Sequence, residues 1–210
     1  MAALINIIHP DTYKAVKREG KLTLIVGDEE ILNERNEKVL NFVDYSLKYG
    51  SNILLHQMFS LDSLKTELRD SAVYLDKKLC KLIKDERVKK IRTLDGGVPL
   101  QDEKPDYAPK EIWDYVNGRV ITDSGFKKLV GNPRQTFFIG GFFEFCLMNF
   151  ADYYAKNIAN GENMYVVPEL CVSIKEDESE KARGILENEG INFVSYKEAL
   201  ELICHNNSFK

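Results

Sequence analysis

Residues 136–146 read Thr-Phe-Phe-Ile-Gly-Gly-Phe-Phe-Glu-Phe-Cys: an apolar run, a pair of glycines and the beginning of an amphipathic segment. The apolar run, Thr136–Ile139, is typical of a buried strand. The amphipathic segment, Phe143–Asn160, carries apolar residues every three or four positions and is followed by Gly161, so we expect a helix there. A strand that passes into a helix is the repeating unit of parallel α/β sheets.

The same alternation of short apolar runs and amphipathic segments extends over much of the chain. We predict further strands at Leu22–Val26, Asn52–Leu55, Arg119–Thr122, Met164–Val167 and Ile191–Ser195. We predict further helices at Glu34–Tyr49, Leu61–Leu82, Lys127–Val130, Glu178–Glu189 and Lys197–Ile203. The strands are continuously apolar, as in a sheet covered on both faces. The sequence therefore predicts a doubly wound, mainly parallel β-sheet with helices on both faces, a three-layer α/β/α architecture. Residues 1–210 would form a single domain with a long irregular loop around 93–118.

Composition and charge indicate to which class of protein the chain belongs. The chain has 210 residues, of which 44% are hydrophobic and 30% charged, and its formal net charge is −4. These values are ordinary for a globular domain and predict no nucleic-acid partner, although a weakly acidic chain can carry a local basic face. The apolar stretches are too short to span a bilayer and no cleavable leader follows Met1, so we expect no membrane partner. The four cysteines have no paired spacing, which indicates reduced thiols and a cytoplasmic location.

In a doubly wound sheet, ligands bind beyond the carboxyl ends of the strands. Three features of the sequence are expected on that rim: Asp28, Gly140–Cys146 and Glu169–Ser173. We expect Glu169 and Ser173 to be turn and helix-capping residues. The rim is therefore where a site is predicted, with the segment that ends at Cys146 as its centre.

Cys146 has the clearest chemistry of these residues. We expect it in the first turn of a helix, where unpaired N–H groups and the helix dipole favour a thiolate. Glu144 acts in the opposite direction, because a nearby carboxylate disfavours a second negative charge. The alternative is that Cys146 is a small buried hydrophobic residue and that the glycines only let strand and helix pack closely.

A family resemblance rests on the order of three segments. The spacing of Gly140–Cys146 resembles the motif of the isochorismatase-like cysteine hydrolases, which include nicotinamidases and N-carbamoyl-amide hydrolases. Leu24–Asp28 resembles the family's first strand with its catalytic aspartate, and Val166–Ser173 resembles the strand and acidic residue after the cysteine helix. The unmatched part is 63–118.

The resemblance implies a site and an activity. By this resemblance, Cys146 would be the nucleophile that attacks a small amide or related acyl compound, and Asp28 would donate and accept the proton. Gly141 and Phe142 form an oxyanion hole beside a cis peptide bond, and Phe143 and Glu144 line the pocket. The family's habit of self-association implies a homo-oligomer.

One departure concerns the lysine of the family's triad. That residue falls at Val120, four positions before Ser124-Gly125-Phe126, while Lys110 and Lys127–Lys128 are at other spacings. A triad without lysine lacks the cation that holds aspartate and cysteine ionised together.

Further departures concern the metal site and the entrance. The metal-binding aspartate and histidine after the family's second strand are missing, so we expect no metal and no cofactor, and a packed or hydrogen-bonded His56. Phe142 and Phe143 stand where the family has small residues, and they either fill the pocket or form an apolar wall for a ring-shaped substrate.

Two functions therefore remain. One is a metal-independent cysteine hydrolase of a small molecule, with Cys146 and Asp28 as its catalytic residues. The other is a catalytically impaired relative that keeps the fold and acts as a binding or assembly protein. A nucleotide-binding module is disfavoured, because Gly140-Gly141 lacks the G-x-G-x-x-G spacing.

Overall fold

An eight-stranded sheet organises the chain. The computed structural model describes residues 3–8, 17–18, 22–23, 29–58, 78–79, 81–93, 112–114, 119–121, 123–173 and 176–205. The strand order is β10-β9-β8-β1-β4-β5-β6-β7. The strands are β1 (Ala3–Ile8), β4 (Asn52–Met58), β5 (Val88–Thr93), β6 (Ile112–Asp114), β7 (Arg119–Ile121), β8 (Gln135–Phe142), β9 (Asn163–Val172) and β10 (Ile191–Phe193). The six strands from β10 to β5 are parallel, and β6 and β7 are antiparallel, which confirms the mainly parallel sheet.

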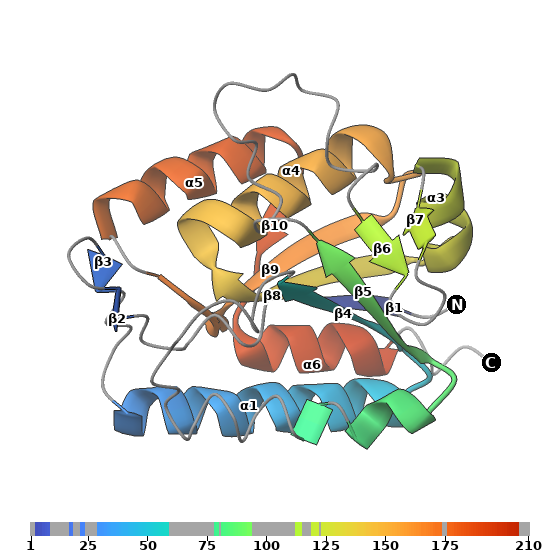
Figure 1. Ribbon diagram of the computed structural model, residues 1–210, viewed down its shortest axis with the longest axis horizontal. Helices are drawn as coiled ribbons and strands as arrows, with labels where there is room; N and C mark the ends of the chain where they lie inside the picture. Colours follow the sequence, from blue (N-terminus) through green and yellow to red (C-terminus); the bar gives the residue numbers. More distant parts are fainter. Residues whose placement is uncertain are drawn as a thin grey trace.

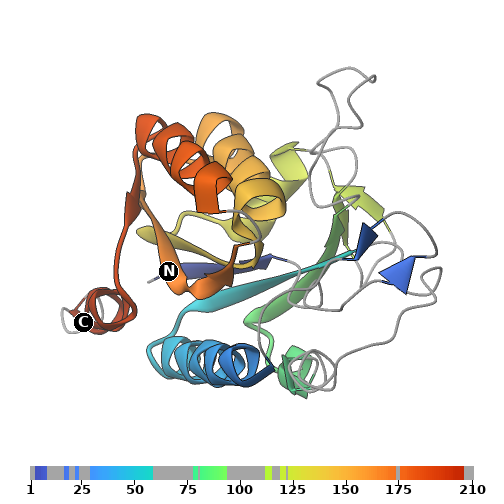
Figure 2. The ribbon, with the colours of Figure 1, turned by 90° about the vertical axis from the view of Figure 1, so that its left-hand side faces the viewer.

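Helices cover both faces of the sheet, which confirms the three layers (Figures 1 and 2). On one face lie α1 (Glu29–Lys48) and α6 (Tyr196–His205). On the other lie α3 (Asp123–Val130), α4 (Met148–Asn157) and α5 (Glu176–Asn188). Within the part of the chain that the structure describes, no helix combines the length and the apolar character that a membrane crossing requires.

Each face buries its own apolar cluster. The α1-side cluster includes Ile5, Ile7, Phe42, Ile53, Phe137, Ile139 and Phe142. The α4-side cluster includes Leu4, Ile8, Phe126, Phe138, Phe143, Cys146, Leu147, Phe150 and Tyr154. Successive residues of a strand point to opposite faces, so a central strand such as β8 must be apolar at every position. This is why the strands read as continuous apolar runs.

The first strand of the parallel sheet is β1, and the prediction of Leu22–Val26 at that place is wrong. All six residues of β1 are buried, and the strand pairs with both β4 and β8. Leu22 and Thr23 form β3, which pairs antiparallel with β2 (Lys17–Arg18) in a separate ribbon. Residues 24–28 lie outside the described residues. Both runs are short and apolar, and periodicity does not tell which run occupies the centre of a sheet.

Several boundaries differ from the predicted ones. α1 begins at Glu29 rather than Glu34, and β9 continues to Val172. Phe143–Leu147 forms a π-helical turn, η4, before α4 begins. The predicted loop around 93–118 contains β6, and residues 94–111 and 115–118 lie outside the described residues. Of the helix predicted at Leu61–Leu82, the structure describes only helical residues 78–79 and 81 and the start of the 3-10 turn η2 (Leu82–Lys84).

A buried tyrosine ties α4 to the amino ends of β8 and β9. The Tyr154 hydroxyl donates to Glu162 Oε1 at 2.9 Å and lies 3.3 Å from Thr136 Oγ1. Burial raises the pKa of Tyr154, so the hydroxyl keeps its proton. The network therefore satisfies a polar group inside an apolar layer.

We predict that Tyr154→Phe lowers the free energy of unfolding by about 1 kcal/mol, the usual net value of a lost buried hydrogen bond. Urea denaturation measures this. Tyr165→Phe is the matched control: its ring stacks on Phe137, and its hydroxyl has no described hydrogen-bond partner, so we expect a change within about 0.5 kcal/mol. Equal losses in the two variants would contradict the assigned role of the network.

Candidate functional site

The order of the strands places a switch point between β1 and β8. From β1 the chain adds β4 and β5 on one side, and β8, β9 and β10 follow on the other. In open α/β sheets, ligands bind beyond the carboxyl ends of strands at this kind of point. Ile8 and Gly140 are paired there, at the end of the two central strands. The predicted segment Gly140–Cys146 therefore begins at the position where a site is expected.

Gly140 occupies a space that no other residue can fill. Its φ is +105°, and a Cβ would lie 2.4 Å from the carbonyl oxygen of Ile8 and 2.9 Å from the Ile8 nitrogen. Both neighbours are backbone atoms of the adjacent strand and cannot rotate away. Glycine is therefore required for the close approach of β8 to β1, as well as for the backbone conformation.

The peptide bond between Gly141 and Phe142 is trans, in contrast to the predicted cis bond; the described residues contain no cis bond. A trans bond is the ordinary state of a non-proline residue, and the positive φ of Gly140 already provides the change of direction. Phe142 has an extended backbone, and η4 starts at the next residue.

Cys146 lies inside the α4-side cluster. It is the fourth residue of η4, and its exposed fraction is 7%. The same cluster contains Ile8, Phe126, Leu147 and Phe150. Cys146 forms no disulfide, as is also true of Cys171 and Cys204. The surroundings of Cys146 correspond to those of a small buried hydrophobic residue.

The two phenylalanines that precede Glu144 are core residues on opposite faces of the sheet. Phe142 belongs to the α1-side cluster, whereas Phe143 belongs to the α4-side cluster. The Phe143 ring meets the Phe193 ring edge to face, with centroids 5.8 Å apart, and the Arg183 guanidinium lies 4.7 Å from the centroid of Phe193. These contacts cover the α4 side of the junction with side chains from β10 and α5.

Glu144 is a buried carboxylate that joins three elements. Its exposed fraction is 4%, and Oε1 accepts hydrogen bonds from the hydroxyls of Ser173, after β9, and Ser179, on α5. The two hydroxyl oxygens lie 2.6 Å apart. A buried carboxylate is stable only when such donors satisfy it, so the network fixes η4 against β9 and α5. The Ser173 side chain thus contacts the junction.

Glu169 has the capping role that the sequence predicts. Its Oε1 accepts a hydrogen bond from the backbone N–H of Tyr196, the first residue of α6, at 3.0 Å. Glu169 lies in an irregular part of β9, since Phe138 pairs with Val166 while Gly140 pairs with Cys171. This bulge holds Pro168, which has no N–H for a ladder.

The bulge brings Cys171, which the sequence analysis did not single out, beside Gly140. The Gly140 N–H hydrogen-bonds the Cys171 sulfur, and Sγ donates to the carbonyl oxygen of Val167 at 3.2 Å. Burial raises the pKa of Cys171 to about 12, although the nearby Arg35 charge and the Gly140 N–H act in the opposite direction. No local sequence pattern identifies this residue, because the bulge sets which β9 residue faces Gly140.

The structure describes only some of the other predicted triad positions. Asp28 and Lys110 lie outside the described residues. The residue at the end of the true first strand is Ile8, whose exposed fraction is 1%. Val120 is on β7, the outermost strand of the sheet. Lys127 and Lys128 are exposed on α3, since Phe126 and Val130 take its buried face.

His56 is packed and hydrogen-bonded, as predicted. Its Nε2 lies 3.1 Å from Asn6 Oδ1, and its ring meets Phe150 edge to face with centroids 4.3 Å apart. Among the residues that the structure describes, no three His, Cys, Asp or Glu side chains are grouped so that they could hold a metal ion.

Comparisons with known proteins agree with the strand order. No family model matches the sequence, and no curated protein matches it. Solved structures do match across most of the chain. The pyrazinamidase/nicotinamidase of Streptococcus mutans is 14% identical with a TM-score of 0.57, over 92% of this chain and 100% of that one. The chain has the isochorismatase-like hydrolase fold.

Two further structures extend this likeness of fold. YcaC from Pseudomonas aeruginosa is 12% identical with a TM-score of 0.57, over 97% of this chain and 80% of that one. An isochorismatase-like hydrolase from Alkaliphilus metalliredigens is 10% identical with a TM-score of 0.56, over 96% of each chain. At these identities the likeness concerns the isochorismatase-like fold, and the chemistry depends on the residues described above.

We predict that Gly140→Ala lowers the free energy of unfolding by about 3 kcal/mol or more, because the added methyl group meets the Ile8 backbone and the positive φ is strained. Gly161→Ala is the matched control. Gly161 also has a positive φ, +82°, but a Cβ there meets nothing within 4 Å, so about 1 kcal/mol is expected. Urea denaturation of both variants gives the comparison. Similar losses would mean that the contact with Ile8 is unimportant.

We also predict that alkylation of Cys171 by iodoacetamide in the folded chain rises about tenfold per pH unit from pH 7 to 10 without a plateau. The raised pKa means that the thiolate fraction grows throughout this window. Peptide mass spectrometry measures the rate. The same peptide in urea should level off above about pH 8.5, and a plateau near that value in the folded chain would contradict the burial of this thiol.

Proposed function

We propose that this chain is a catalytically impaired protein of isochorismatase-like fold that works as a binding or assembly protein. The observation that carries the proposal is the place of Cys146, 7% exposed in the α4-side cluster together with Ile8 and Phe126. A cysteine nucleophile must be reachable and must act as a thiolate. A charged sulfur among these apolar side chains would be unfavourable without a cation.

Two neighbouring positions support the same conclusion. Ile8 stands at the end of the central strand, where the resemblance implies an acid that moves the proton. Glu144, two residues before Cys146, adds a negative charge, and its carboxylate is already occupied by Ser173 and Ser179. A nucleophilic thiol needs a group that activates it and later protonates the leaving group, and an apolar side chain such as that of Ile8 cannot do either.

A metal-independent hydrolase that uses Cys146, with Asp28 as acid and base, is the second candidate. The observation that favours it is the position of η4 directly after the carboxyl end of β8, at the switch point. Proteins described as nicotinamidases and pyrazinamidases are among the structures of similar fold. In this reading the substrate is a small amide, and Phe143 is an apolar wall.

Alkylation of Cys146 separates the two candidates. At pH 7.5 we expect iodoacetamide to modify Cys146 at least about tenfold more slowly in the folded chain than in urea, because burial limits both access and ionisation. Peptide mass spectrometry identifies the modified cysteine. Faster modification in the folded chain than in urea would favour the hydrolase.

Turnover gives a second, independent measurement. Nicotinamide and pyrazinamide are incubated with the chain and with Cys146→Ala, and ammonia release is followed. We expect equal rates. Cys146-dependent release of ammonia would overturn the proposal, and Asp28→Asn would then test the proton-transfer role of Asp28, with Glu162→Gln as a distant control.

Assembly is the remaining part of the proposal. We propose self-association, which follows from the family resemblance, and sedimentation equilibrium measures it directly. A mass of 24.1 kDa at all concentrations would mean that the chain is a monomer, and binding of another molecule would then be its function.

A further inference from the structure

A strongly basic segment lies far from Cys146. Residues 77–92 contain eight lysines and arginines and two acids, in a chain whose formal net charge is −4. The described part of this segment is a helical piece (78–79 and 81), η2 and β5. The charge of the whole chain therefore hides a local excess of positive charge.

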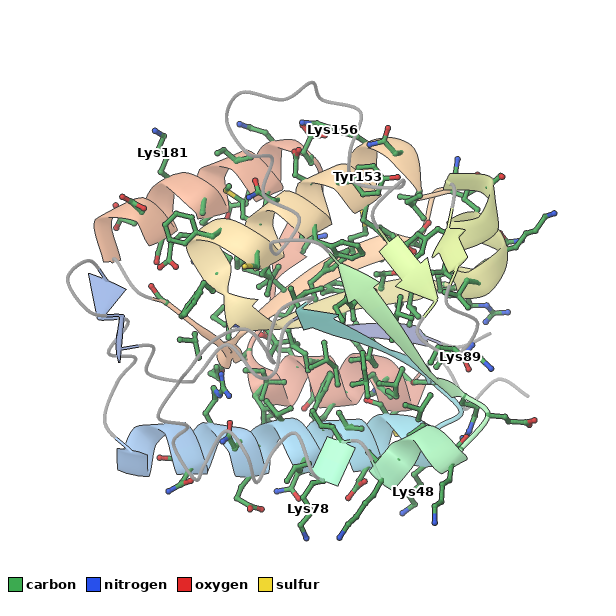
Figure 3. The ribbon with its side chains drawn as sticks, viewed as in Figure 1. Lys48, Lys78, Lys89, Tyr153, Lys156 and Lys181 are labelled. Carbon is green, nitrogen blue, oxygen red and sulfur yellow. The ribbon has the colours of Figure 1, made fainter. Side chains whose placement is uncertain are left out.

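The structure places lysines of this segment beside the end of α1. Lys78, Lys81, Lys84 and Lys89 are exposed, and so is Lys48 in the last turn of α1; we call these five residues the basic face. Figure 3 shows Lys48 and Lys78 projecting from the α1 side of the molecule, with Lys89 at the adjoining edge. Among the residues that the structure describes, Glu86 and Asp44 are the exposed acids nearest to them in sequence.

Buried contacts fix the backbone that carries the basic face. Leu79 and Val88 belong to the α1-side cluster, so both ends of the segment are anchored in the core. Arg87 Nη1 donates to the carbonyl oxygen of Leu47, in the last turn of α1, at 2.5 Å. Arg87 also donates hydrogen bonds to Asp85 through Nε and Nη2, so the charges of these two residues neutralise each other. The lysines are thus carried on backbone whose position is set by buried contacts.

Four lysines of the basic face differ in their ion pairing from three basic residues on α1, α4 and α5. Lys38, Lys156 and Arg183 each have a carboxylate four residues away within 2.8 Å. By contrast, Lys48, Lys81, Lys84 and Lys89 form no ion pair with any carboxylate that the structure describes. Like charges that gather without such partners repel one another, and a bound polyanion removes this cost.

The side chains of the basic face indicate which kind of anionic partner they suit. Protein interfaces depend on aromatic, apolar and arginine anchors and are poor in lysine, and membrane-surface segments add apolar side chains to the basic ones. The exposed large hydrophobic residue among those described is Ile185, on α5, away from these lysines. Flexible lysines without apolar neighbours suit a chain of phosphates, which they contact as point charges.

We propose that the basic face binds the phosphodiester backbone of nucleic acid without reading its sequence. The prediction of no nucleic-acid partner came from the charge of the whole chain, whereas this face is local. Lys48, Lys84 and Lys89 lie close in sequence to the amino ends of β4 and β5, whereas Cys146 follows the carboxyl end of β8. The inference is therefore independent of whether Cys146 catalyses a reaction.

Fluorescence polarisation tests the proposal with the intact chain and fluorescein-labelled 20-nucleotide poly(U) RNA and poly(dT) DNA. We expect binding of both at 50 mM salt and an affinity at least about tenfold weaker at 200 mM, because bound phosphates release counterions. The double variant Lys48→Glu/Lys84→Glu should bind at least tenfold more weakly than the unmodified chain. The control Lys181→Glu/Lys197→Glu makes the same charge change on α5 and α6 and should bind within about twofold of it.

Several results would overturn the proposal. These are no binding at 50 mM salt, equal losses in the two double variants, or a stronger preference for poly-glutamate or for vesicles that contain phosphatidylserine. Circular dichroism of both variants should match the unmodified chain, since all four substituted side chains are exposed. If the Lys48/Lys84 variant were unfolded, Lys81→Gln/Lys89→Gln would take its place, with the same expected direction.

Discussion

The close approach of β8 to β1 is the constraint on which the centre of this molecule depends. Gly140 lies where any side chain would meet the backbone of Ile8, and its positive φ turns the chain at the end of the strand. Phe142 and Phe143 then enter the clusters on opposite faces of the sheet. The same turn directs Cys146 into the α4-side cluster and leaves Glu144 to be held by Ser173 and Ser179. The junction is thus closed by apolar packing on both sides and by one satisfied carboxylate.

Much of the fold could be predicted because burial on both faces leaves a strong trace in the sequence. The continuous apolar runs at Asn52–Leu55, Thr136–Ile139 and Met164–Val167 are strands of the parallel sheet. The same signal failed at β1, because Asn6 interrupts that run and Leu22–Val26 has an equally apolar composition. The buried Asn6 is accommodated by its contact with His56, which lies far away in the sequence and has no local signature.

The candidate site could be predicted only in part for a similar reason. The spacing of Gly140–Cys146 lies within one short segment, so it can be recognised from the sequence alone. The partners of these residues are set by tertiary structure: Ile8 by the pairing of β1 with β8, and Cys171 by a bulge in β9. The hydrogen bonds of the Glu144 carboxylate come from Ser173 and Ser179, which lie 29 and 35 residues later in the chain. One spacing can therefore occur in different environments, and function has to be argued from the environment.

The π-helical turn gives the junction a property that an ordinary helix start lacks. A π turn corresponds to an α-helix that carries one additional residue. Deleting one residue from Phe143–Leu147 would restore α-helical spacing and rotate the residues of the turn that precede the deletion by about 100° relative to α4. Phe143 and Glu144 would then leave the contacts with Phe193 and the two serines, while α4 and its aromatic packing could stay in place. A single-codon deletion is thus a short evolutionary path by which the contacts of this junction would change while the strand order stays the same.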